Sequence, residues 1–198
     1  HHAVILPIAR SDEERAAVLE ACGRLEADLK GASFAGEPIR VKIDARDIRG
    51  GDKVWQHIKQ GVPVRLEIGP RDLAAGAASL TRRDRGPKER EAIPLAELPA
   101  RLPEILAEIQ EGLFDRAAAF RESRSVRLES AAEVSEYFAR DDAGFAWVHV
   151  ADDPAIAALL DPLKVTVRCI PQDGPDEPGR CIVTGREVPR RSVLARAY

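Results

Sequence analysis

The stretch that most constrains the fold runs from residue 61 to residue 72 and reads Gly-Val-Pro-Val-Arg-Leu-Glu-Ile-Gly-Pro-Arg-Asp. Its valines, leucine and isoleucine alternate with polar residues or proline, which is the period of a β-strand with one face in a core. The Gly-Pro pair that follows ends this strand and can begin a helical turn. Arg65 lies on the strand and Arg71 lies just past its carboxyl end, where open α/β sheets bind ligands. The simpler interpretation is that both arginines belong to a solvated polar face.

Strand and helix patterns alternate from the start of the chain to about residue 122. The helical segments carry apolar residues at helical spacing, and the run Ser11-Asp-Glu-Glu14 matches a capping box. Strands separated by helices indicate a mixed α/β domain, in which a mainly parallel sheet is flanked by helices on both sides. The expected strands are 4–8, 39–43, 62–68 and 77–82, and the expected helices are 12–30, 53–60 and 98–122.

A junction near residues 123–130 separates a second, smaller α/β unit that extends to residue 198. The expected helices in this unit are 129–138 and 154–160, and the expected strands are 145–150 and 163–170. Apolar packing should hold the unit together, through residues such as Val165, Val167, Ile170 and Ile182.

Overall charge narrows the kinds of partner. A formal net charge of −3 and an isoelectric point near 5.9 exclude a protein that binds nucleic acid by charge alone, so RNA contacts must be local and no DNA partner is expected. No run of about 18 apolar residues occurs, so no membrane partner is expected. Three widely spaced cysteines argue against a disulfide framework and favour a cytoplasmic location.

The densest positive charge lies at residues 82–90, which carry five cations and two anions around a Gly-Pro turn. We call this segment the cationic turn. A hairpin here would project Arg82, Arg83 and Arg85, which makes them candidates for contact with an RNA backbone. Charge runs of this kind are more often solvated loops, so both interpretations stay open.

Two glycines, Gly50 and Gly51, follow the expected strand at 39–43. Such a pair can cradle a phosphate, but no Gly-Lys-Ser/Thr follows, and a loop that needs positive φ is the better interpretation. A small-molecule site on a doubly wound sheet would rest on these glycines alone. His57, on the short helix that follows, is expected at the surface.

Several motifs together resemble one family. The motif at residues 61–72 is followed by Ser-Leu-Thr-Arg-Arg-Asp at 79–84, and the tail carries Arg-Cys-Ile-Pro at 168–171 and Gly-Arg-Cys-Ile at 179–182 before it ends in Tyr198. In this order they resemble the C-terminal part of an archaeal/eukaryotic-type prolyl-tRNA synthetase. The resemblance covers the whole chain and implies a class II synthetase anticodon-binding domain at 1–122, with its long C-terminal helix, and a C-terminal domain at 123–198.

The resemblance also implies what this chain does. It would recognise the anticodon of tRNA(Pro) and carry no catalytic residues, because the 198 residues leave no room for the catalytic domain that ligates proline to tRNA. ATP and Mg would belong to that missing domain, which is an expected partner, and the full enzyme is a candidate homodimer. The alternative is an interaction module of the same fold that has lost specific RNA readout. In the family the tyrosine tail reaches toward the catalytic domain, so Tyr198 would be a loose end here.

The resemblance assigns candidate anticodon residues. Arg65 and Arg71 match family positions that contact the anticodon, and an arginine fork suits the O6 and N7 acceptors of the two guanines in proline anticodons. Val54 and Ile58 replace the aromatic residue and the glutamate that the family usually carries on the preceding helix. The remaining candidates on that helix are Lys53 and Trp55, of which Trp55 either stacks on a base or is a half-buried core residue.

A zinc site of the same family is degenerate here. The family often binds zinc through four cysteines, whereas Val150 and Ala155 occupy the first pair of positions and Cys181 and Thr184 occupy the second. One thiolate and a threonine cannot form a closed tetrahedral site. We therefore expect no zinc and no other cofactor in this chain.

Overall fold

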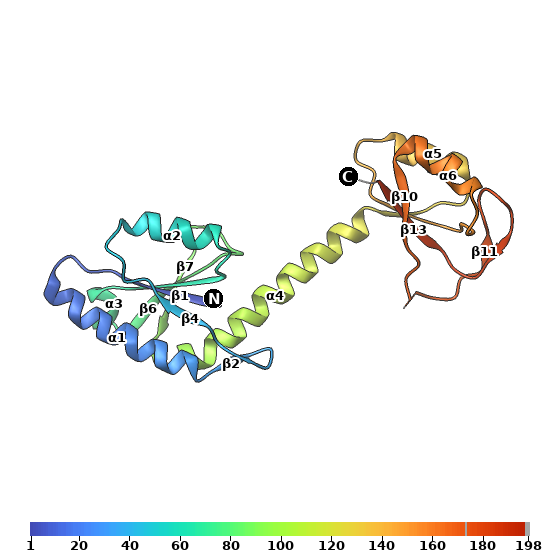
Figure 1. Ribbon diagram of the computed structural model, residues 1–198. Coiled ribbons are helices and arrows are strands. Elements are labelled where there is room, and N and C mark those ends of the chain that lie inside the picture. The colour runs from blue at the N-terminus through green and yellow to red at the C-terminus, as the bar shows by residue number, and fades with distance from the viewer. Residues whose placement is uncertain (173, 197–198) are drawn as a thin grey trace. The chain divides into compact units, whose positions relative to one another are not determined.

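The computed structural model describes residues 1–172 and 174–196, so Tyr198 lies outside the described part (Figure 1). The chain divides into two compact units between Phe114 and Asp115. This division falls inside the long helix α4 (Leu98–Ser123), whose last residue is next to the domain boundary expected from the sequence. No helix in the described ranges is long and apolar enough to cross a membrane.

The first unit is built on a five-stranded sheet in the order β4-β1-β5-β6-β7. Strand β1 pairs in parallel with β4 and β5, whereas β6 pairs antiparallel with both β5 and β7. A small hairpin of β2 and β3 stands apart from this sheet. The strands are β1 (Ala3–Pro7), β2 (Ser33–Phe34), β3 (Glu37–Pro38), β4 (Val41–Ile43), β5 (Val64–Ile68), β6 (Ala77–Arg82) and β7 (Arg90–Pro94).

Helices cover both faces of this sheet, which confirms the mixed α/β fold class. Helices α1 (Asp12–Lys30) and α4 pack on one face, and α2 (Gly50–Lys59) lies on the other (Figure 1). The alternation of β1 explains the two layers: Ala3 and Ile5 enter the main core with α1 and α4, while Val4 and Leu6 pack toward α2. A one-turn helix, α3 (Pro70–Ala74), follows β5 with proline at its start, as expected.

Strand β5 is buried on both faces. Val64, Leu66 and Ile68 lie in the main core, as their spacing predicts. Arg65 and Glu67 point to the opposite face and are also buried, with 3% and 9% of their surface exposed. The simpler interpretation of Arg65 as part of a solvated face is therefore wrong, because α2 and the neighbouring strands cover that position.

The start of α2 also differs from the expectation. Gly50 and Gly51 form its first turn, and neither has a positive φ. The expected loop is wrong because a glycine pair before an amphipathic segment can join the helix when tertiary packing fixes the backbone.

The second unit contains a four-stranded sheet in the order β10-β13-β9-β8, in which only β8 and β9 pair in parallel. Val167 on the edge strand β10 and Ile170 just after it, both expected in the core, are instead exposed, whereas Val165 is buried. Its elements are β8 (Ser125–Arg127), α5 (Ala131–Ala139), β9 (Phe145–Val148), α6 (Ala155–Leu160), the 3-10 turn η1 (Asp161–Leu163), β10 (Val165–Cys169), β11 (Gly179–Arg180), β12 (Glu187–Val188) and β13 (Ser192–Arg196).

Candidate nucleic-acid interface

A row of polar side chains crosses the sheet on the face that α2 covers. The strand register places Arg65, Thr81 and Arg90 side by side on β5, β6 and β7, with the apolar Val4 of β1 next to Arg65. Residues two positions apart on a strand share a face, so Glu67 lies on the same side, one step along β5 from Arg65. This face therefore carries two arginines and a carboxylate beside α2.

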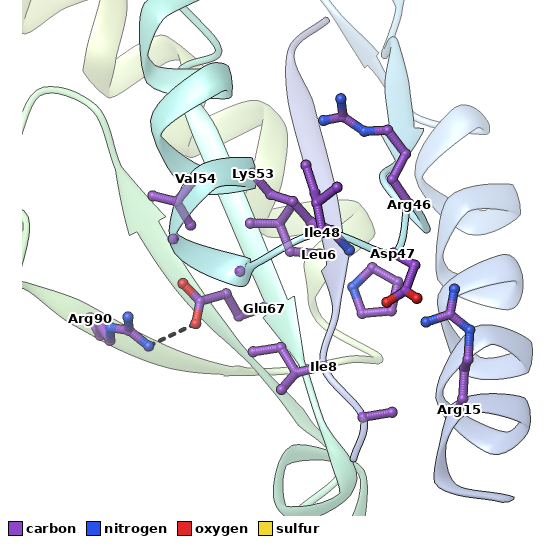
Figure 2. Close-up of a pocket in the computed structure, with 14 residues that line it drawn as sticks. Leu6, Ile8, Arg15, Arg46, Asp47, Ile48, Lys53, Val54, Glu67 and Arg90 are labelled. Atoms are coloured by element: carbon purple, nitrogen blue, oxygen red, sulfur yellow. Dashed lines mark hydrogen bonds and ion pairs between the residues drawn. The ribbon is translucent and has the colours of Figure 1, made fainter. Parts of the chain in front are cut away.

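A cleft of about 470 Å³ opens between this row and the start of α2 (Figure 2). One wall is the end of β1 with the residues after it, and the other is the segment that leads into α2. Glu67 and Arg90 close the side nearest to the hairpin strands. Its lining residues are Leu6, Pro7, Ile8, Ala9, Arg15, Arg46, Asp47, Ile48, Gly50, Gly51, Lys53, Val54, Glu67 and Arg90.

Glu67 and Arg90 form an ion pair at the edge of the cleft. Arg90 Nη1 donates to Glu67 Oε2 at 2.8 Å, and Arg90 itself is mostly exposed. The pair holds a nearly buried carboxylate in a fixed position, which is the arrangement that makes a charge-assisted hydrogen bond strong. Neither residue was among the candidates named from the sequence, although Glu67 lies in the same motif and on the same strand face as Arg65.

Arg65 lies next to this pair and is buried. Its Nη1 atom has no hydrogen-bond partner in the described part of the chain and is shielded from solvent. Burial lowers the pKa of the Arg65 guanidinium, Glu67 raises it and Arg90 lowers it again. A buried cationic donor without a partner costs free energy, and Arg65 is not among the residues that line the cleft.

Helix α2 is fixed to the sheet by a buried polar cluster. His57 Nε2 lies 2.8 Å from Asp44 Oδ2, and Lys53 Nζ donates to the backbone oxygen of Asp44 at 3.2 Å. Arg46 donates two further hydrogen bonds to the Asp44 carboxylate. The Arg46 hydrogen bonds, with a smaller contribution from His57, hold the pKa of Asp44 well below its ordinary value even though burial opposes them. The expectation of a surface His57 is therefore wrong, because its ring turns inward to meet a loop that is distant in sequence.

The other α2 candidates occupy three different environments. Val54 lines the cleft and packs against the apolar residues of β1, and Ile58 is half-buried. Trp55 is 57% exposed, with Lys59 Nζ 5.5 Å from the centre of its ring. The core interpretation of Trp55 is thus wrong, and its ring is open to a stacking partner.

Arg71 lies in a separate cleft. It is exposed on α3 and borders a hollow of about 370 Å³ together with Arg10 and Glu14. The Asp72 carboxylate accepts a hydrogen bond from the Gly69 N–H at 2.8 Å, which stabilises the turn that carries Arg71. The motif thus places its two arginines in different surroundings, one buried and one exposed.

The cationic turn joins β6 and β7 as a hairpin, but it does not project all of its cations. Arg82 is 5% exposed and pairs with Asp84 on its own segment and with Glu108 on α4. The expectation of a projecting Arg82 is wrong, because these two carboxylates neutralise it. Arg83 and Arg85 are exposed.

The degenerate zinc positions lie in the second unit. Cys181 is buried with Val150 in the core of that unit, and its Sγ accepts a hydrogen bond from the Thr184 N–H at 3.4 Å. Burial acts to raise the pKa of the Cys181 thiol, but the hydrogen bonds from Thr184 and nearby backbone groups lower it overall. Ala155 is exposed. Within residues 1–172 and 174–196, no three His, Cys, Asp or Glu side chains gather into a candidate metal site.

A mixed sheet with a cleft of arginines and a carboxylate, and with an exposed tryptophan on the adjacent helix α2, defines a domain suited to unpaired bases. Residues 2–105 match the family described as the anticodon binding domain, so the chain belongs to that family.

Proteins that are similar to this chain over nearly all of its residues support the same assignment. The chain is 44% identical over 200 residues to a protein from Bdellovibrio bacteriovorus named proline–tRNA ligase, and 45% identical over 202 residues to one of that name from Rhodopirellula baltica. A protein named proline–tRNA ligase 2 from Anaeromyxobacter dehalogenans is 42% identical over 207 residues. These alignments cover 98–100% of this chain but only 39–40% of each relative.

Proposed function

We propose that this chain is the non-catalytic, tRNA-binding C-terminal part of a proline–tRNA ligase, and that its cleft beside α2 reads the anticodon of tRNA(Pro). The observation that carries the proposal is the row of Arg65 and Arg90 with Glu67 on the sheet face beside α2. Proline anticodons carry two guanines. Arginine supplies donors for O6 and N7 of guanine, and a carboxylate supplies an acceptor for its N–H groups.

The rest of the ligase follows from this proposal. The catalytic domain, absent from this chain, would bind ATP and Mg and ligate proline to the tRNA. The relatives named above are bacterial, so they do not support the archaeal/eukaryotic type. That part of the proposal rests on the tail motifs that end in Tyr198. A homodimer of the full enzyme and a cytoplasmic location belong to the same proposal.

We also propose that the chain binds no zinc. Cys181 is the one thiol at the four degenerate positions, and it packs against Val150 in an apolar core. Metal analysis of the purified chain should give far less than one zinc per molecule. Stoichiometric zinc would overturn this proposal.

A binding experiment tests the proposed function. The full chain should bind the anticodon stem–loop of tRNA(Pro) more tightly than stem–loops with unrelated anticodons, with an affinity that falls as salt rises. Arg71→Ala should weaken binding by about 1–3 kcal/mol. The control is Arg24→Ala, which removes an equal charge from an exposed position of α1, on the face of the sheet opposite to α2.

The same experiment separates the alternative function. An interaction module without RNA readout is favoured by the apolar Val54 and Ile58 at positions where the family usually carries an aromatic residue and a glutamate. Such a module would bind all stem–loops equally or not at all. Equal losses for Arg71→Ala and Arg24→Ala would also favour it, because the interaction would then depend on charge alone.

A further inference from the structure

We propose that Glu67 determines base specificity, by accepting hydrogen bonds from N1–H and N2–H of one guanine in the anticodon. The inference rests on the proposed function and adds to it a residue and a base edge. Arginines alone read the O6 and N7 side of guanine. A carboxylate would read the opposite, Watson–Crick edge, which is exposed in an unpaired base.

The geometry leaves one oxygen of Glu67 available. Arg90 Nη1 occupies Oε2, and Oε1 takes part in no hydrogen bond within the described residues. Oε1 is also not one of the unpartnered atoms that are shielded from solvent, so the cleft reaches it. In Figure 2 the oxygen that is not bonded to Arg90 points toward the first turn of α2, on the side of Val54. Burying nine-tenths of a carboxylate costs free energy unless its oxygens accept hydrogen bonds. A donor on a ligand in the cleft would supply the hydrogen bond that the open oxygen lacks.

The cleft can accept a base. Its volume of about 470 Å³ lies within the range of about 300–1,000 Å³ for small-ligand pockets. Val54 and Leu6 supply apolar surface beside Glu67, and the adjacent Lys53 is held by Asp44 rather than by Glu67. Glu67 is therefore the carboxylate that takes over the acceptor role missing at Ile58 on α2.

A carboxylate at this position discriminates between purines. Guanine presents two parallel donors, N1–H and N2–H, which the free Oε1 and the remaining lone pair of Oε2 can accept, while adenine presents the N1 lone pair. The Arg90 pair holds the Glu67 carboxylate in place, so the N1 lone pair of an adenine would face a carboxylate oxygen. The competing explanation is that Glu67 only balances the charges of Arg65 and Arg90, and it predicts no effect that depends on the base.

The test measures the binding of protein variants to RNAs in which a single amino group has been removed. The full chain, Glu67→Gln and Glu91→Gln are each titrated with the tRNA(Pro) anticodon stem–loop and with two copies in which one guanine is replaced by inosine, which lacks the N2 amino group. Glu91 is the matched control, because it is an exposed glutamate on β7 next to Arg90 but points to the other side of the strand.

We expect one of the two inosine substitutions to weaken binding to the wild-type chain roughly 5- to 100-fold. Glu91→Gln should show the same inosine penalty. In Glu67→Gln the unmodified RNA should bind more weakly, and the inosine penalty should fall to twofold or less. Thermal melting of each variant confirms that it is folded.

Two results would overturn the role of Glu67 while leaving the proposed function intact. One is an unchanged inosine penalty in Glu67→Gln. The other is anticodon-dependent binding by the wild-type chain with no penalty for either inosine, a result that does not depend on how the variant folds. If the wild-type chain does not distinguish anticodons at all, the proposed function fails, and this inference fails with it.

Discussion

His57 Nε2 lies 2.8 Å from Asp44 Oδ2, and both side chains are almost completely buried. The pair joins the second half of α2 to the loop that follows β4. Because Lys53 also reaches the backbone oxygen of Asp44, two consecutive turns of α2 are fixed to one residue. The wall of the cleft therefore depends on His57 and Asp44, which do not line it, as well as on Lys53, which does.

Asp44→Ala should lower the free energy of unfolding by about 2–3 kcal/mol, because it leaves the buried His57 without its partner. Asp47→Ala is the control, since Asp47 is exposed in the same loop, and it should change stability by less than about 0.5 kcal/mol. Urea unfolding of both variants measures the difference. Equal stability of the two would mean that α2 is held mainly by the packing of Val54.

The same carboxylate makes stability depend on pH. Its pKa in the folded chain is below the ordinary 3.8, so its contribution is fully present above that value and is lost as pH falls through the folded pKa. The stability difference between wild type and Asp44→Ala should therefore be constant near neutral pH and shrink below about pH 4. Urea unfolding at a series of pH values from 7 to 2.5 measures it, and a constant difference down to the lowest pH would contradict the assignment.

Arg65→Met should separate stability from binding. The guanidinium is buried with an unpartnered Nη1, so an apolar side chain of similar length should leave the unfolding free energy within about 1 kcal/mol of wild type or raise it. Affinity for the tRNA(Pro) stem–loop should fall by about 1–3 kcal/mol, the range for a lost bidentate guanine contact. Urea unfolding and RNA titration of the same preparation give both values. A large loss of stability with unchanged affinity would show that Arg65 serves the fold alone.

Arg82→Ala and Arg83→Ala should give opposite results within one turn. Arg82 bridges Asp84 and Glu108, so its loss should destabilise the first unit by about 2–3 kcal/mol. Arg83 is exposed, so Arg83→Ala should leave the free energy of unfolding within about 0.5 kcal/mol of wild type. It should also lower the slope of log affinity against log salt concentration by about 1, the value for one lost phosphate contact. Thermal unfolding and binding at several salt concentrations distinguish them. Unchanged salt dependence in Arg83→Ala would show that Arg83 of the cationic turn does not contact the RNA.

Gly144→Ala tests a close backbone approach in the second unit. A Cβ at this position would lie 2.3 Å from the backbone oxygen of Arg124, which also accepts a hydrogen bond from the Phe145 N–H. The variant should lose about 1–3 kcal/mol of stability. Gly23→Ala, in the middle of α1 with open space around it, should gain about 0.5–1 kcal/mol. Differential scanning calorimetry of both variants measures these changes, and a neutral Gly144→Ala would mean that β8 shifts freely to accept the methyl group.

Local patterns predicted much of the architecture. The helix α1 has the bounds that its spacing predicts, and its cap is the predicted Ser11, whose side chain accepts a hydrogen bond from the Glu14 N–H. The proline start of α3 was also predicted as it occurs, whereas β5 begins two residues later than predicted, because Val62 packs with Val4 and Leu6 instead of in the main core. Each of these features depends on residues within a few positions of one another, so periodicity and capping residues contain the necessary information.

The tertiary structure alone decided how the charged side chains are used. The spacing of β5 shows that Arg65 and Glu67 share a face, but only the packing of α2 and the pairing with β7 make that face buried and bring Arg90 to Glu67. Likewise, the Asp44 and Glu108 carboxylates that pair with His57 and Arg82 come from segments 13 and 26 residues away. The periodicity of a strand or helix fixes which way a side chain points, whereas its burial, charge and partner depend on segments that meet only when the chain folds.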